Sequence, residues 1–226
     1  MTAGLLARAL AGLTFLLVAI AAAVFISAGT LDYWQAWTFL GVFGTCVLAI
    51  TIDLARRDPA LLERRVKAGP LAEPSVIQTI VQSIASFAFL GLFAVAGLDH
   101  RFGWSHVPAV IAIAGNALVA VGLAIVVFVF RANTYTSAVI AIAEQQRVVS
   151  TGPYAVVRHP MYAGAGIMLV GSALALASWW AACAVVLLLA VIVWRLLDEE
   201  RVLATELAGY AEYRERVRWR LVPFVW

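Results

Sequence analysis

Four long apolar runs occupy most of the first 130 residues and limit the fold more than any other feature. They cover about residues 6–26, 34–54, 77–97 and 107–130. A helix needs about 20 apolar residues to cross the hydrocarbon core of a bilayer. The composition agrees, with 64% hydrophobic and 13% charged residues, whereas soluble domains have roughly 45–50% apolar and about 25% charged residues. The sequence therefore predicts an all-α, polytopic membrane protein.

Two further apolar runs follow a break of about 28 residues after Arg131, at about residues 160–178 and 180–197. Only Trp179 and its neighbours separate them, which favours a tight helical hairpin or a re-entrant pair. Pro160 suits the first turn of a helix, where its missing N–H is not needed. The chain then has about six membrane helices. We expect the first run to be retained, because it is too long for a signal peptide and lacks a clean cleavage site.

The distribution of Lys and Arg predicts the orientation in the membrane. The loop between the second and third runs carries Arg56, Arg57, Arg64, Arg65 and Lys67, whereas the loop before it has no Lys or Arg. Basic loops stay on the cytoplasmic side. With six spans both termini are cytoplasmic, and we expect a multi-pass protein of the bacterial inner membrane. Residues 199–217 are expected to form one cytosolic helix, with an apolar stripe of Leu203, Leu207, Tyr210 and Val217.

A polar segment, Thr-Gly-Pro-Tyr-Ala-Val-Val-Arg-His-Pro-Met-Tyr-Ala-Gly, covers residues 151–164 at the start of the fifth run. Ionisable groups at a membrane boundary are costly unless partnered, so Arg158 and His159 indicate a functional site. An isolated histidine here could instead bind a backbone carbonyl or a lipid headgroup. Gly164 and Gly166 follow, and their missing side chains allow close approach of a ligand or of another helix.

A second polar cluster follows the sixth run. Arg195 and Glu199 are four residues apart and share a helix face, while Glu200 points about 100° away from Glu199. A guanidinium can bind a carboxylate or phosphate through two parallel hydrogen bonds, and a carboxylate can accept hydrogen bonds from a ribose or an amino group. The alternative is that these charges only mark the water boundary, with Glu200 solvated. Because Cys46 and Cys183 lie in apolar runs and the three histidines are scattered, no metal site is predicted.

The two clusters together resemble a known family. Gly152-Pro153-Tyr154, Arg158-His159-Pro160, Tyr162, Gly164, Glu199-Glu200 and a tail with Tyr210, Tyr213, Arg214, Val217 and Pro223 are similar to the isoprenylcysteine carboxyl methyltransferases (ICMT) and their bacterial relatives. Phospholipid N-methyltransferases share part of the pattern. The resemblance covers about residues 130–226. It implies a methyltransferase-like catalytic region at 132–226, after a four-span membrane region at 1–131.

The resemblance also implies S-adenosylmethionine as the methyl donor, in a cytosolic pocket roofed by the C-terminal segment. The residues expected to bind it are Gln146, Arg147, Val148, Val149, Tyr154, His159, Pro160, Met161, Tyr162 and Glu199. Arg195 would face the acceptor as a catalytic residue, and Glu200 is the candidate for a general base. One departure is Ala141, which lies in an apolar stretch where relatives often carry a glutamine.

The implied reaction is O-methylation of a lipophilic acceptor from the bilayer, a carboxylate of an isoprenylcysteine-like or other isoprenoid compound. A carboxylate is already nucleophilic, so positioning and removal of water suffice. Two other functions stay open: an NADPH-dependent membrane reductase of the sterol-reductase type, and a non-enzymatic transporter or scaffold. The expected partners are this acceptor and membrane lipids. Nucleic acid is not expected, because the basic residues fall in separate short clusters.

Overall fold

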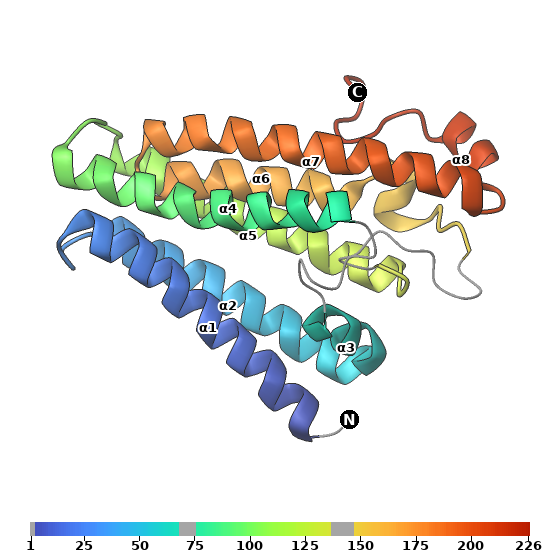
Figure 1. Cartoon of the computed structure of the whole chain (residues 1–226), viewed down its shortest axis with the longest axis horizontal. Coiled ribbons are helices and arrows are strands. Elements are labelled where there is room, and N and C mark those ends of the chain that lie inside the picture. The colour runs from blue at the N-terminus through green and yellow to red at the C-terminus, as the bar shows by residue number, and fades with distance from the viewer. Residues whose placement is uncertain (1–2, 68–75, 137–146) are drawn as a thin grey trace.

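The computed structural model describes residues 3–67, 76–136 and 147–226, and within these ranges it contains only helices and loops. The prediction of an all-α protein is therefore confirmed. Figure 1 shows the long helices packed side by side. The helices are α1 (Ala3–Ala28), α2 (Trp34–Arg57), α3 (Pro59–Lys67), α4 (Val76–Phe102), α5 (Ala109–Ala132), the 3-10 helix η2 (Gly152–Ala155), α6 (Pro160–Ala175), α7 (Trp179–Glu206) and α8 (Tyr210–Arg216).

In the described part of the chain, five helices are long and apolar enough to cross a membrane, namely α1, α2, α4, α5 and α7. The sixth predicted span, α6, is apolar but has 16 residues, fewer than the roughly 20 needed for a full crossing. Large apolar side chains such as Phe15 and Phe87 are exposed on the outer faces. Such faces are stable in contact with lipid rather than water. The protein is therefore a membrane protein.

The predicted hairpin of the two last apolar runs is present. The helix α6 begins at Pro160, as expected, and α7 follows after a short turn. The Ser178 side chain ends that turn by accepting a hydrogen bond from the Ala181 amide at 2.9 Å. The helix α7 extends past the predicted end at residue 197 to Glu206. This longer helix carries Arg195 and Glu199 on its last turns.

Two features near the same end of the bundle differ from the prediction. The sequence did not predict α3, which begins where the Asp58 carboxylate accepts a hydrogen bond from the Leu61 amide at 2.9 Å. The tail was predicted as one helix over 199–217, and this is wrong. Gly209 adopts a left-handed conformation with φ of 82° and separates α7 from α8, a conformation that glycine tolerates best. The predicted stripe nevertheless gathers, because Leu207, Tyr210 and Val217 pack in one apolar cluster.

Glycines bring α5 and α6 into close contact. A Cβ atom at Gly122 would lie 2.5 Å from the Gly164 carbonyl oxygen, and one at Gly164 would lie 2.8 Å from the Gly122 oxygen. Close backbone approach at small residues is a common way for membrane helices to pack. Gly164 thus serves helix packing, while a Cβ at Gly166 would only touch Leu189 at 3.3 Å. This contact fixes α6 against α5. It also fixes the position of the polar segment 151–164, which leads into α6.

A polar cluster fastens the opposite end of the bundle. The buried Asp99 carboxylate accepts hydrogen bonds from the Ser105 amide at 2.7 Å and from the Ser105 hydroxyl at 2.6 Å. It also accepts one from the Ser178 hydroxyl in the turn between α6 and α7. Tyr33 stacks on His100 with ring centroids 3.9 Å apart. These contacts join the segment before α2, the end of α4 with the loop after it, and the turn before α7, far from the polar segment 151–164.

The glycine contact can be tested by replacing Gly122 with alanine. Gly122→Ala is expected to destabilise the protein by about 1–3 kcal/mol, because the added methyl group meets backbone atoms that cannot move independently. Thermal unfolding in detergent micelles measures this loss. Gly91→Ala on α4 is the matched control, since a Cβ there meets nothing within 4 Å. Equal melting temperatures for the two variants would contradict the close packing of α5 on α6.

Candidate functional site

A cavity opens at the end of the bundle where α6 begins and α7 ends. Its empty volume is about 930 Å³, part of which is open to solvent, and small-molecule sites typically enclose roughly 300–1,000 Å³. Its lining combines polar, aromatic and apolar side chains from four parts of the chain. The lining residues are Asn133, Tyr135, Thr136, Arg147, Val148, Val149, Tyr154, Arg158, His159, Pro160, Met161, Tyr162, Arg195, Glu199, Val202, Leu203, Leu207, Tyr210 and Tyr213.

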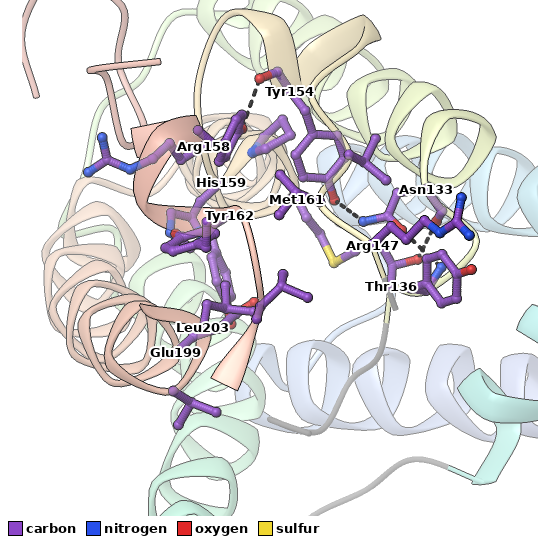
Figure 2. Close-up of a pocket in the computed structure, with 18 of the residues that line it drawn as sticks. Asn133, Thr136, Arg147, Tyr154, Arg158, His159, Met161, Tyr162, Glu199 and Leu203 are labelled. Carbon is purple, nitrogen blue, oxygen red and sulfur yellow. Dashed lines mark hydrogen bonds between the residues drawn. The ribbon is translucent and has the colours of Figure 1, made fainter. Parts of the chain in front are cut away.

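One side of the cavity is built around Tyr154. The Asn133 amide donates a hydrogen bond to the Tyr154 hydroxyl at 3.2 Å, and the Tyr213 hydroxyl donates to the Tyr154 carbonyl at 2.8 Å. Burial raises the pKa of Tyr154 to about 12, with a smaller opposing effect from Asn133. The Tyr154 hydroxyl is therefore neutral at physiological pH. Figure 2 shows this group on the side of the cavity opposite Tyr162 and Glu199, with Met161 between them.

The other side of the cavity joins α6 to α7. The Tyr162 hydroxyl donates a hydrogen bond to the Glu199 carboxylate at 2.7 Å, and the Arg195 guanidinium also interacts with that hydroxyl. The two α7 residues face the same cavity because they are four positions apart. A hydrogen-bonded carboxylate and a guanidinium therefore lie within one helical turn of each other, on the wall of a single cavity.

Glu200 lies in a different environment from its neighbour Glu199. Its carboxylate accepts hydrogen bonds from Arg158 Nε at 2.7 Å and from Arg220 Nε at 2.9 Å, and His159 Nε2 lies 3.4 Å away. Glu200 and Arg158 are both buried, with exposed fractions of 5% and 7%. We call these four residues the Glu200 network. Buried charges need such partners, because an uncompensated charge away from water is very costly.

The Glu200 network also fastens the end of the chain. Arg158 Nη1 donates to the carbonyls of Val217 and Arg218, both at 2.9 Å. The backbone amides of Arg158 and His159 donate to the carbonyls of Trp219 and Arg220 at 2.8 and 2.9 Å. Figure 2 shows the Arg158 side chain directed away from the centre of the cavity. The tail is thus held against the start of α6, beside the cavity.

Most of the residues predicted to bind the cofactor line this one cavity. They are Arg147, Val148, Val149, Tyr154, His159, Pro160, Met161, Tyr162 and Glu199, and the predicted catalytic residue Arg195 lines it as well. Gln146 and Ala141 lie outside the described residues. The structure places Glu200 apart from this lining, in its own ion-pair network. The alternative that Glu200 is solvated is wrong, because three partners enclose it.

Several lining residues were not predicted from the sequence. Asn133 and Thr136 come from the segment at and after the end of α5. Leu203 was predicted only as part of an apolar stripe. Its position four residues after Glu199 could have indicated its place, since residues four apart share a helix face. No comparable signal in the sequence points to Asn133.

Residues 110–208 match the phospholipid methyltransferase family. No curated protein matches the chain. The family match indicates a membrane methyltransferase and starts at the beginning of α5, so it includes the fourth predicted span. Among the described residues, no group of three or more His, Cys, Asp or Glu side chains is placed to hold a metal ion.

Glu200→Gln is expected to destabilise the fold far more than Glu199→Gln. The first change leaves Arg158 and Arg220 without their carboxylate and should cost about 3–5 kcal/mol. The second should cost no more than about 1 kcal/mol, because an amide oxygen still accepts the Tyr162 hydrogen bond. Thermal unfolding in detergent compares the two variants directly. A greater loss of stability in Glu199→Gln would contradict the structural role of Glu200.

Proposed function

We propose that this protein transfers a methyl group from S-adenosylmethionine to the carboxylate of a lipophilic acceptor, an isoprenylcysteine-like or other isoprenoid compound. One observation carries the proposal. Residues of the polar segment 151–164, His159 among them, and the Arg195–Glu199 pair near the end of α7 line the same cavity. The match of residues 110–208 to the phospholipid methyltransferase family supports the reaction type.

The lining residues fit the chemical groups of S-adenosylmethionine. The Glu199 carboxylate is an acceptor for hydrogen bonds, which ribose hydroxyls and an α-amino group donate. The Tyr210 hydroxyl is buried and has no hydrogen-bond partner among the described residues. Burial raises the pKa of Tyr210, and the charge of Glu200 adds to this effect, so the hydroxyl stays protonated. The rings of Tyr154 and Tyr213 provide aromatic surface for an adenine.

When bound, S-adenosylmethionine would supply a methyl group whose carbon–sulfur bond breaks, with a neutral thioether as leaving group, as the acceptor oxygen bonds to the methyl carbon. The protein's own contribution is to hold the acceptor and exclude water, which can lower the barrier by roughly 7–11 kcal/mol. Arg195 is suited to orient a carboxylate. The predicted general base Glu200 pairs with two arginines, and such pairing favours its charged form and makes it a weaker base. A carboxylate acceptor needs none, which supports O-methylation.

The cavity is further proposed to face the cytoplasm. The basic helix α3 and the tail helix α8 lie at the same end of the bundle, the right-hand end in Figure 1, and α1 begins there too. The last turn of α3 carries Arg64, Arg65 and Lys67. Basic segments remain on the cytoplasmic side of a membrane. A location in the bacterial inner membrane stays a prediction.

Binding of S-adenosylhomocysteine tests the cofactor directly. Isothermal titration calorimetry on the full chain in detergent should show binding, weakened about tenfold in Glu199→Gln, because one hydrogen bond from the ligand loses its charged acceptor. Glu206→Gln, on the exposed end of the same helix, is the matched control and should bind like the natural protein. Absence of binding in the natural protein would contradict the proposed cofactor.

The acceptor group can be identified from the product. Membranes containing the protein are incubated with methyl-labelled S-adenosylmethionine, and the extracted lipids are treated with mild base. Labelled methanol is expected, because base cleaves methyl esters, and Arg195→Leu should reduce its release at least tenfold, as expected for the loss of a charge-assisted contact. Label that stays on the lipid would show methylation of nitrogen or sulfur and would contradict a carboxylate acceptor.

A further inference from the structure

Gln78 brings the N-terminal half of the chain into contact with the candidate site. It lies on the first turn of α4, outside the segment that matches the methyltransferase family. Its side chain is buried, with 4% of the residue exposed. The Gln78 Oε1 atom accepts a hydrogen bond from Arg195 Nη1 at 3.0 Å, and its amide nitrogen donates to the Asp198 carboxylate. The bridge therefore crosses from α4 to α7.

The chemistry of its two partners fixes the orientation of the Gln78 amide. A guanidinium only donates hydrogen bonds and an ionised carboxylate only accepts them. The amide oxygen must therefore point toward Arg195 and the nitrogen toward Asp198. Because Asp198 lies three residues after Arg195 on α7, the amide spans a single helical turn. An amide held at both ends in this way restricts the rotation of the arginine side chain.

A neutral amide suits this position better than an acid would. Arg195 lines the cavity, whereas Gln78 does not. The amide oxygen orients the guanidinium through a hydrogen bond and places no further negative charge beside it. A carboxylate at position 78 would compete with an incoming anion for Arg195 and would also lie next to the like charge of Asp198.

We infer that Gln78 is a positioning residue that holds the Arg195 guanidinium in place to receive an anionic acceptor group. This inference rests on the proposed function and deepens it, because it assigns the recognition of negative charge to a contact between the two halves of the chain. Gln78 itself touches neither the acceptor nor the cofactor. Its effect is exerted through Arg195 alone.

Two probes that differ by one methyl group, and therefore in charge, test this role. They are N-acetyl-S-farnesyl-L-cysteine, which carries a carboxylate, and its methyl ester, which is neutral. Binding of each is measured by calorimetry on the full chain in detergent with S-adenosylhomocysteine present. Gln78→Leu is expected to weaken binding of the acid about tenfold, the size of one charge-assisted hydrogen bond, and to leave binding of the ester within twofold. Gln82→Leu, one turn further along α4, is the control and should change neither.

Gln78→Glu provides a second variant that keeps an oxygen next to Arg195. It should also weaken binding of the acid selectively, since the new carboxylate competes for the guanidinium. Equal effects on acid and ester, or no effect on either, would overturn the inference. If Gln78→Leu weakens binding of the acid alone but the natural protein transfers no methyl group to the acid, the proposed function fails while the role of Gln78 in binding anions is upheld.

Discussion

The carboxylate of Glu200 connects three parts of the chain that are far apart in sequence. It comes from α7, Arg158 precedes α6, and Arg220 belongs to the C-terminal tail. A buried carboxylate is stable only with such partners, and each arginine in turn needs the carboxylate. Because the Arg158 backbone also binds the tail, the same contact fixes where the His159 motif meets the end of α7. The cavity is shaped by this arrangement.

Two different kinds of contact hold the helices together away from the cavity. Near the middle, α5 and α6 approach through Gly122 and Gly164, where dispersion contacts between backbones replace side-chain packing. At the end far from the cavity, Asp99 joins loops through hydroxyl and amide donors. Neither contact contributes to the lining of the cavity, so both hold the helices in place without occupying the candidate site.

Sequence patterns predicted those parts of the protein that depend on local order. Apolar runs of sufficient length gave the membrane helices, Pro160 marked the start of α6, and the spacing of Arg195 and Glu199 placed both on one wall. The patterns could not give contacts between distant segments. Nothing near Gln78 in the sequence indicates that its amide contacts Arg195. The sequence also does not show that Glu200 is buried, because its partner Arg220 lies in the distant C-terminal tail. The break at Gly209 was missed because the apolar stripe continues across it.

The helix α7 carries both Arg195 and Glu199, so the position of one relative to the other depends on the register of a single helix. The two groups are four residues apart on a regular helix, about 6 Å along its axis. An insertion or deletion of a single residue between them would rotate one relative to the other by about 100°. Substitutions on the surrounding helices leave the spacing of Arg195 and Glu199 unchanged, whereas a change in the register of this one turn would separate them.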